Sequence, residues 1–352
     1  EGVKLDYQAS GYRHDNSGNF VGDIAASNGY TVPTGTSSDG GTTDITFLMG
    51  GNINDGRGNI TAYATYRDIS AITQDQRDYS ACAITIQSST SPTANPTFCG
   101  ASATSAPGTF YFATDGFANA YHTDGNTFAP GIVYFNFGPP CYYQRPDQRY
   151  TLGAFGHYGL SVQAEVYTQL MFMDDRTVAQ FAPAGMFFDS GVSIPCSNPL
   201  LSAQQLGIMG CTGDPDQRVG VYLGRRNVEG GPRFGDLRHT TYRGVFGLRG
   251  DLSDAWRYDV SGQRAEVDMR NRNGNYTDTA KIARALDVNP NGQCESVIDG
   301  SDLACVPYNI FQTGGVTPDQ TAYFAQQYFE RGTTEQNVAN AYVQGSLDEY
   351  GV

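Results

Sequence analysis

The feature that most constrains this chain is a two-residue alternation of apolar and polar side chains, which recurs in eight short segments. In the first segment, Val3, Leu5 and Tyr7 alternate with Lys4 and Asp6. Because successive side chains of a β-strand point to opposite faces, this pattern predicts a strand with one apolar and one polar face. The eight strands are expected at about residues 3–14, 43–53, 60–68, 149–159, 162–173, 239–250, 256–268 and 337–347.

The connections between these segments alternate between short and long. Short turns are expected near residues 54–59, 159–161 and 251–255, and long loops at about 15–42, 68–148, 174–238 and 270–336. Most loops have about 4–6 residues, whereas short turns at one end and long loops at the other are typical of a transmembrane β-barrel. We therefore predict an all-β fold, an antiparallel transmembrane β-barrel segment whose long extracellular loops contain short helices. A soluble antiparallel sheet is the alternative for any single segment.

The composition narrows the class of protein. Aromatic residues make up 12% of the 352 residues, which is enough apolar surface to exclude a disordered chain. The formal net charge of −14, with no run of Lys and Arg, argues against nucleic acid as a partner. No stretch approaches the roughly 18 consecutive apolar residues of a spanning helix. The first residues do not resemble a signal peptide, so an export signal is expected to lie outside this sequence.

Six of the seven cysteines fall into neighbouring pairs, separated by 17, 15 and 11 positions. No C-x-x-C motif occurs and the four histidines are far apart, so disulfides account for the cysteines better than zinc does. Disulfides imply an oxidising compartment. Loop-closure entropy favours near neighbours, which predicts one disulfide inside each of three long loops. The expected pairs are Cys82–Cys99, Cys196–Cys211 and Cys294–Cys305, with Cys141 unpaired. The competing arrangement joins Cys141 to Cys99 or Cys82.

The long loops also carry helix signals. Residues 200–209 and 278–286 have helical composition. Thr317 and Gln320 match a capping box, in which the two side chains bond reciprocally to the first turn of a helix. We expect short surface helices at all three places.

Several strings along the chain resemble those of a known family. They are Glu1–Tyr7, Gly56–Asn59, Arg77–Cys82, Gln144–Tyr150, Phe172–Arg176, Arg226–Arg233, Cys305–Phe311 and Gly314–Thr317. On these strings the chain resembles the TonB-dependent outer-membrane receptors, particularly the large-loop kind common in alphaproteobacteria. Members of this family form barrels of about 22 strands that are closed by an N-terminal plug.

The resemblance implies a location, partners and a function. It implies a receptor of the bacterial outer membrane that contacts outer-membrane lipid and captures a scarce small molecule of the siderophore, cobalamin or oligosaccharide class. Uptake would be energised by an inner-membrane energy-coupling protein through the plug. The plug and its coupling box are missing here, and no further strands follow Leu347–Val352. We therefore expect residues 1–352 to be the N-terminal part of a barrel domain, about eight strands of the whole.

Two sets of residues are candidate site residues. The first consists of charged residues on the polar faces of the strands, which are expected to face an aqueous lumen: Lys4, Asp6, Glu165, Arg243, Arg249, Arg257 and Asp259. The second is Tyr142, Tyr143 and Gln144 in a long loop, which could contact a sugar or a siderophore or pack the loops together. We favour packing, because tyrosines commonly bury the ring and hydrogen-bond the hydroxyl at places where one end of the side chain reaches water.

The sequence offers no enzyme signature. The hydrolase, zinc-protease, phosphate-loop and dinucleotide-binding motifs do not occur. Asp174 and Asp175 are adjacent on a strand, so their carboxylates should point to opposite faces. Residues 287–292 match the first half of a calcium loop, but Ile298 stands where the bidentate Glu belongs. We expect no enzyme activity, no cofactor and no metal site.

Two other classes of protein fit the pattern. Eight strands could close on themselves as a small outer-membrane barrel that acts as an adhesin or structural surface protein. The chain could also be a secreted β-protein that binds carbohydrate, provided that a second sheet covers its apolar face.

Overall fold

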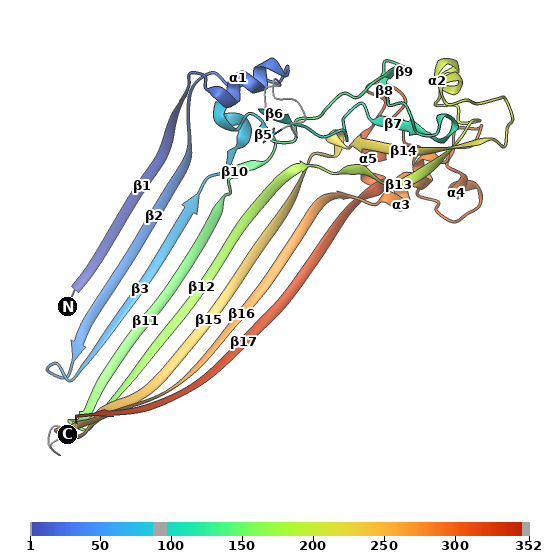
Figure 1. The fold of residues 1–352 in the computed structure, drawn as a ribbon. Helices are drawn as coiled ribbons and strands as arrows, with labels where there is room; N and C mark the ends of the chain where they lie inside the picture. Colours follow the sequence, from blue (N-terminus) through green and yellow to red (C-terminus); the bar gives the residue numbers. More distant parts are fainter. Residues whose placement is uncertain (1, 87–96, 347–352) are drawn as a thin grey trace.

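A computed structural model describes residues 2–86 and 97–346. One antiparallel sheet of eight long strands dominates it, in the order β1-β2-β3-β11-β12-β15-β16-β17. The strands run side by side from short turns at one end to helices and small sheets at the other (Figure 1). Their bounds are Gly2–Asn16 (β1), Gly35–Ile53 (β2), Gly58–Ile69 (β3), Asp147–Ser161 (β11), Ala164–Pro183 (β12), Pro232–Ser253 (β15), Trp256–Thr277 (β16) and Ala325–Gly345 (β17).

All eight expected strands are present, but several extend further into the expected loops. Strand β2 begins at Gly35, β12 runs to Pro183 and β17 begins at Ala325. The long loops are correspondingly shorter than expected from the sequence. In β2 and β17 the reason is that much of the extension is polar on both faces, as in residues 35–42 and 330–337, so that no alternation marks it. Residue 347, the last of the final expected strand, lies outside the described residues.

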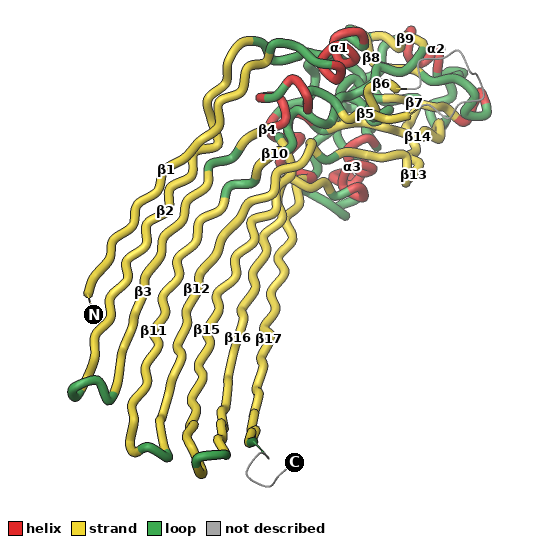
Figure 2. The backbone as a smooth tube through the Cα atoms, turned by 60° about the vertical axis from the view of Figure 1, so that its left-hand side comes forward, coloured by secondary structure: helices red, strands yellow, loops and turns green. Residues whose placement is uncertain are grey.

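The short turns lie together at the end of the sheet opposite the helices (Figure 2). Asn54 and Asp55, between β2 and β3, adopt φ angles of 54° and 53°. Asn and Asp tolerate this left-handed region better than most residues. Within the described residues β1 and β17 each pair with one long strand only, so the sheet is open at both edges.

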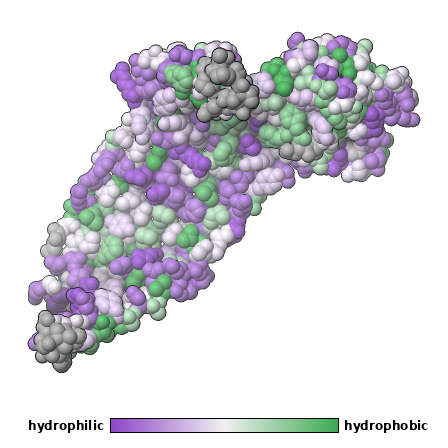
Figure 3. Space-filling model, in the orientation of Figure 1, coloured by the Kyte–Doolittle hydropathy of each residue, from purple (hydrophilic) through white to green (hydrophobic). Residues whose placement is uncertain are grey.

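The large sheet has almost no core of its own. Ala182 and Val245 are the only buried hydrophobic residues of its eight strands in the described part of the chain. Large apolar side chains are instead exposed, among them Val3 (70%), Leu5 (69%) and Phe246 (65%). Figure 3 shows hydrophobic residues at the surface along the sheet, interspersed with hydrophilic ones. The hydrophobic stabilisation of this sheet therefore has to come from contacts that its exposed apolar side chains make with their surroundings.

The long loops fold into smaller elements at the other end. Five short strands form a second sheet, in the order β13-β14-β7-β8-β9, which the sequence did not predict. The remaining bounds are Phe20–Ser27 (α1), Ile72–Thr73 (β4), Gln74–Gln76 (η1), Asp78–Ser80 (η2), Ala83–Ile86 (β5), Thr97–Gly100 (β6), Thr109–Phe112 (β7), Ala113–Asp115 (η3), Tyr121–Asp124 (β8), Thr127–Pro130 (β9), Tyr142–Gln144 (β10), Gly185–Pro195 (β13), Ala203–Ile208 (α2), Arg218–Arg226 (β14), Val228–Gly230 (η4), Thr279–Leu286 (α3), Glu295–Ile298 (α4) and Pro318–Phe324 (α5).

We call residues 97–135, 184–231 and 278–324 the cap, because these three loop segments share one hydrophobic core. Phe110 is fully buried there against Phe128, with ring centroids 4.8 Å apart. The ring of Tyr308 meets that of Phe324 at 4.9 Å. The cap is thus a small domain assembled from segments that lie far apart in the sequence.

The expected helices are confirmed with small shifts. The capping box of α5 forms as predicted, since the Thr317 hydroxyl accepts from the Gln320 amide and the Gln320 side chain accepts from the Thr317 amide. Asp278 caps α3. Helix α2 begins later than expected, because a second capping box between Ser202 and Gln205 sets its start.

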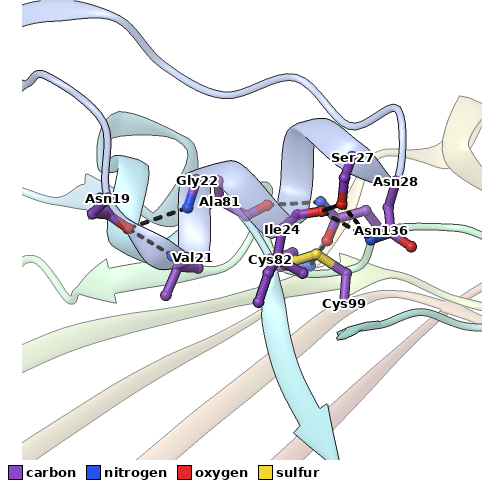
Figure 4. The surroundings of a disulfide bond; sticks show 11 residues. Asn19, Val21, Gly22, Ile24, Ser27, Asn28, Ala81, Cys82, Cys99 and Asn136 are labelled. Carbon is purple, nitrogen blue, oxygen red and sulfur yellow. Dashed lines mark hydrogen bonds between the residues drawn. A yellow bond between two sulfur atoms is a disulfide. The ribbon is translucent and has the colours of Figure 1, made fainter. Parts of the chain in front are cut away.

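The three expected disulfides are confirmed, and Cys141 is free. Around Cys82–Cys99, Asn19 caps α1 by accepting from two backbone amides, and Asn136 donates to the carbonyl oxygen of Ala81 at 2.7 Å (Figure 4). This disulfide joins a small cluster with Ile24 and Ala25 of α1. Each disulfide therefore stabilises one loop rather than joining different loops.

Replacing Cys294 and Cys305 by alanine should lower the free energy of unfolding of the cap by about 3 kcal/mol, because the closed loop regains its entropy in the unfolded state. Limited proteolysis within residues 278–324 at increasing urea concentration measures the change. Cys141→Ala is the control and should shift the transition much less. An equal loss in the control would contradict the pairing.

Candidate functional site

The register of the large sheet decides which side chains share a face. Directly opposed residues of an antiparallel pair lie on the same face, and Lys4–Leu48, Glu165–Arg249 and Arg249–Asp259 are such pairs. Followed strand by strand, the pairing puts the seven charged residues expected at a lumen on one face: Lys4, Asp6, Glu165, Arg243, Arg249, Arg257 and Asp259. We call this the polar face. That it lines a lumen stays a prediction.

Hydrogen bonds between strands hold several polar side chains of the polar face. Arg249 Nε of β15 donates to Glu165 Oε1 of β12 at 2.6 Å, and Tyr167 of β12 reaches across β15 to donate its hydroxyl to Asp259 Oδ1 of β16 at 2.8 Å. Arg243 Nε donates to Gln263 Oε1 at 2.9 Å. Side chains held in this way form a lattice of fixed polar groups.

Two tyrosines of the polar face lie over glycines of the next strand. A Cβ atom added to Gly247 would lie 2.2 Å from Cζ of Tyr167, and one added to Gly153 would lie 2.3 Å from Cε1 of Tyr63. The glycines therefore leave the space that the rings fill. Aromatic rings over glycines are a known way to restore packing where a strand lacks a side chain.

At the end near the cap, a segment of the second long loop covers the polar face. Arg77, whose side chain is 3% exposed, makes a two-pronged ion pair with Asp39 of β2. The carboxylate of Asp78 accepts from His14 Nε2 at 3.0 Å and from the Gly18 amide at 3.1 Å. Burial raises the pKa of Asp78, but these hydrogen bonds outweigh it and hold the pKa below its usual range. These contacts anchor the loop to β1 and β2.

The expected contact residues Tyr142, Tyr143 and Gln144 form β10, which pairs with β4 beside this anchored segment. Gln144 Nε2 donates to the Ser70 carbonyl at 3.0 Å, which is a packing role. Tyr143 is 55% exposed, and its ring stands edge-on to Tyr79 at 5.6 Å. Of the three side chains, that of Tyr143 is the best placed to meet a ligand, and its role stays a prediction.

The opposite face of the large sheet is mainly apolar, and we call it the apolar face. Val3, Leu5 and Phe47 lie on it near one edge, and Val166 and Leu248 lie opposite each other further along. On β16 and β17 the apolar stretch is shorter, because it gives way to charges that include an Arg264–Glu335 ion pair at 3.6 Å. The cap leaves most of this face uncovered.

Aromatic side chains border the apolar stretch at both ends. On the cap side, Tyr66 meets Tyr150 at 5.0 Å and Phe172 meets Tyr242 at 5.3 Å, each pair directly opposed in the register. On the turn side lie Tyr158, Trp256 and Tyr258. The sequence shows Trp256 and Tyr258 just after a short turn. The Tyr66–Tyr150 and Phe172–Tyr242 pairs, in contrast, can be recognised only from the register.

One residue at the base of the cap escaped the sequence reasoning. Arg226 is buried at 4% exposure, and its guanidinium donates to the Pro183 carbonyl and to Ser102 Oγ, both at 3.0 Å. The same group lies over the ring of Phe187 at 4.8 Å. Burial lowers the pKa of Arg226 to about 10. Through its bond to Pro183, Arg226 links the cap to the end of β12. The only sequence feature that could have drawn attention to this residue is the doublet Arg225–Arg226.

The adjacent acids Asp174 and Asp175 and the half calcium pattern at residues 287–292 make structural contacts. Asp174 and Asp175 point to opposite faces as expected, towards Arg238 and Arg149. Asp287, the first residue of the half calcium pattern, pairs with Arg218 at 3.0 Å. Asn289 uses its side-chain oxygen to accept from two backbone amides of its own turn. No group of three or more His, Cys, Asp and Glu in the described part of the chain could hold a metal ion.

Among the described helices none is long and apolar enough to cross a membrane. Comparisons with models of known protein families, with curated proteins and with solved structures find no match.

Gly247→Ala should lower the free energy of unfolding by about 1–3 kcal/mol, because the new methyl group displaces the Tyr167 ring and with it the hydrogen bond to Asp259. Urea unfolding in detergent, followed by heat-modifiable migration on a gel, measures the effect. Gly262→Ala is the matched control, since a Cβ added to Gly262 meets nothing within 4 Å. A loss of the same size in both variants would show that the close contact is not the cause.

Proposed function

We propose that this chain is part of an outer-membrane import receptor that captures a scarce small molecule for energy-coupled uptake. The observation that carries the proposal is the apolar face, an exposed apolar stretch between two aromatic borders on a sheet whose opposite face is charged. This arrangement matches the lipid-facing surface of an outer-membrane barrel, where an apolar band about 25 Å tall lies between aromatic girdles.

The dimensions support a membrane-spanning role. Tyr150 and Tyr158 lie eight positions apart on β11. At about 3.3 Å per residue this spacing corresponds to about 26 Å along the strand. Strands of such barrels tilt by about 35–45°, which leaves a height of about 20 Å for the apolar stretch. A soluble protein would need a second sheet over this face, and none of the described elements supplies one.

The open edges support a barrel larger than eight strands. Strands β1 and β17 lie at opposite edges of the sheet, each with one side unpaired. Unpaired backbone groups are very costly in lipid, so we propose that further strands complete the barrel, about 22 in all as in TonB-dependent receptors. The small closed barrel would require β1 to pair with β17, and no described contact favours that pairing.

Ligand capture is assigned to the cap and to the polar face beneath it. The cap has its own core and disulfides, so it can hold a binding surface in a fixed shape outside the membrane. The fixed hydrogen-bonding groups of the polar face suit the passage of a hydrophilic molecule. The proposed ligands remain those of the siderophore, cobalamin or oligosaccharide class, and the proposed role is transport without catalysis.

The proposal predicts opposite sides of the membrane for the two ends of the sheet. In a Cys141→Ala background, Asn126→Cys in the β8–β9 turn of the cap should react with a membrane-impermeant maleimide on intact cells. Val162→Cys, 85% exposed in the turn between β11 and β12, should react only after the outer membrane is permeabilised. Mass spectrometry of the full-length protein measures the labelling. Equal labelling of both positions on intact cells would contradict the proposed orientation.

Import itself is tested in cells that lack the gene and are complemented with the full-length protein. Uptake of labelled ferric siderophores, cobalamin and oligosaccharides should rise for one of these classes on complementation and should fall to background when the inner-membrane energy coupling is removed. A variant that lacks residues 101–135 should reduce this uptake at equal surface expression. Uptake that persists without energy coupling would contradict active import.

A further inference from the structure

Four arginines form a straight row across the apolar face at its cap-side end. Arg176, Arg238, Arg270 and Arg331 are directly opposed in the register of four neighbouring strands, β12, β15, β16 and β17. Directly opposed residues of an antiparallel pair have Cα atoms only about 4.5–5.5 Å apart. Like charges in such positions destabilise a sheet. We call these four residues the arginine row.

The acidic residues nearby neutralise only part of this charge. Arg176 pairs with Asp236 at 2.6 Å, and Arg238 pairs with Asp174 at 3.0 Å. Within the described residues neither Arg270 nor Arg331 makes an ion pair, and both are exposed.

Further charged residues and a groove surround the arginine row. Asp268, two residues before Arg270 on β16, accepts from the Thr333 hydroxyl at 2.6 Å. Arg272 adds a further positive charge above the row and donates to Gln327 at 3.3 Å. The groove there has a volume of about 430 Å³, and its charged lining consists of five arginines, the four of the row and Arg272, against two acids, Asp236 and Glu330. Asn271 and Phe329 complete the lining. The groove is therefore a site of surplus positive charge on a chain whose net charge is −14.

The position of the row points to the kind of anion. Arg176 lies four residues beyond Phe172 on β12, and Arg238 lies four residues before Tyr242 on β15. Four residues correspond to about 13 Å of strand. The row therefore lies just outside the cap-side aromatic border, where the head groups of a lipid leaflet would begin if the apolar face contacts lipid.

We propose that the arginine row binds the phosphorylated head group of an outer-leaflet lipid, one that carries phosphate monoesters. A phosphate monoester presents up to three acceptor oxygens and about two negative charges, which matches a line of guanidinium groups. The acyl chains of the same molecule would then lie on the apolar face below. This inference rests on the proposed function, because it needs the apolar face to contact lipid.

The test uses the full-length protein, purified in detergent, stripped of lipid and titrated with diphosphoryl lipid A in micelles. Native mass spectrometry counts the bound lipid and gives the apparent Kd. In the double variant Arg270→Gln and Arg331→Gln the apparent Kd should rise about tenfold or more, since at least one charge-assisted hydrogen bond is lost. The corresponding lysine variant keeps the charge and should lose less affinity.

A matched control removes two arginines from the polar face, as Arg67→Gln and Arg257→Gln. Its apparent Kd should remain within about twofold of the wild-type value. A further readout is thermal unfolding. Without lipid the Arg270 and Arg331 double variant should be at least as stable as the wild type, because repulsion is relieved. With lipid only the wild type should gain stability.

Three outcomes would overturn the proposal: an unchanged Kd in the double variant, an equal loss in the control, or inorganic phosphate that competes at the same concentration as the lipid. The failure of this proposal can be told from that of the proposed function. If Asn126→Cys is labelled on intact cells and the Kd does not change, only the lipid site is wrong. If the cap is not labelled from outside, the proposed function fails whatever the micelle titration shows.

Discussion

The hydrogen-bonded register that joins β1 to β17 is the constraint on which the other features depend. Side chains of a strand alternate between two faces, so a slip of one residue at any strand pair would exchange the faces of every strand beyond it. The same register opposes Glu165 to Arg249, Tyr66 to Tyr150 and Arg238 to Arg270. The ion pairs, the aromatic border and the arginine row are thus consequences of one backbone arrangement.

The molecule combines two parts that gain stability in different ways. The cap buries its aromatic and aliphatic side chains in a core of its own, around Phe110 and Phe311. The large sheet buries almost none, so its hydrophobic stabilisation has to come from its surroundings. Arg226 lies where the two parts meet, and the partners that the structure gives its guanidinium include no carboxylate. They are the Pro183 carbonyl oxygen, the Ser102 hydroxyl and the rings of Phe135 and Phe187.

The sequence predicted those elements whose signals are local. Alternation located the eight long strands, near-neighbour spacing gave the three disulfides, and Thr317 and Gln320 marked the start of α5. Strand extensions that are polar on both faces carried no alternation. The five-stranded sheet of the cap was missed because its strands are short and come from different loops, as Thr109–Phe112 and Arg218–Arg226 do. Alternation within each strand placed Arg243 and Asp259 on the polar side of β15 and of β16, and the register joins these sides into one face. The arginine row depends on the alignment between strands, which no single segment encodes.

The confinement of each disulfide to one loop has a consequence for the order of assembly. The cap core needs residues near 110, near 220 and near 310 together, so it cannot be completed until the last of these segments has been made. Oxidation does not have to wait for that step, because both cysteines of each bridge are already neighbours in the chain. Under oxidising conditions a newly made polypeptide can therefore acquire all three crosslinks while it is still unfolded elsewhere, and the later meeting of the loops requires no exchange of sulfur partners.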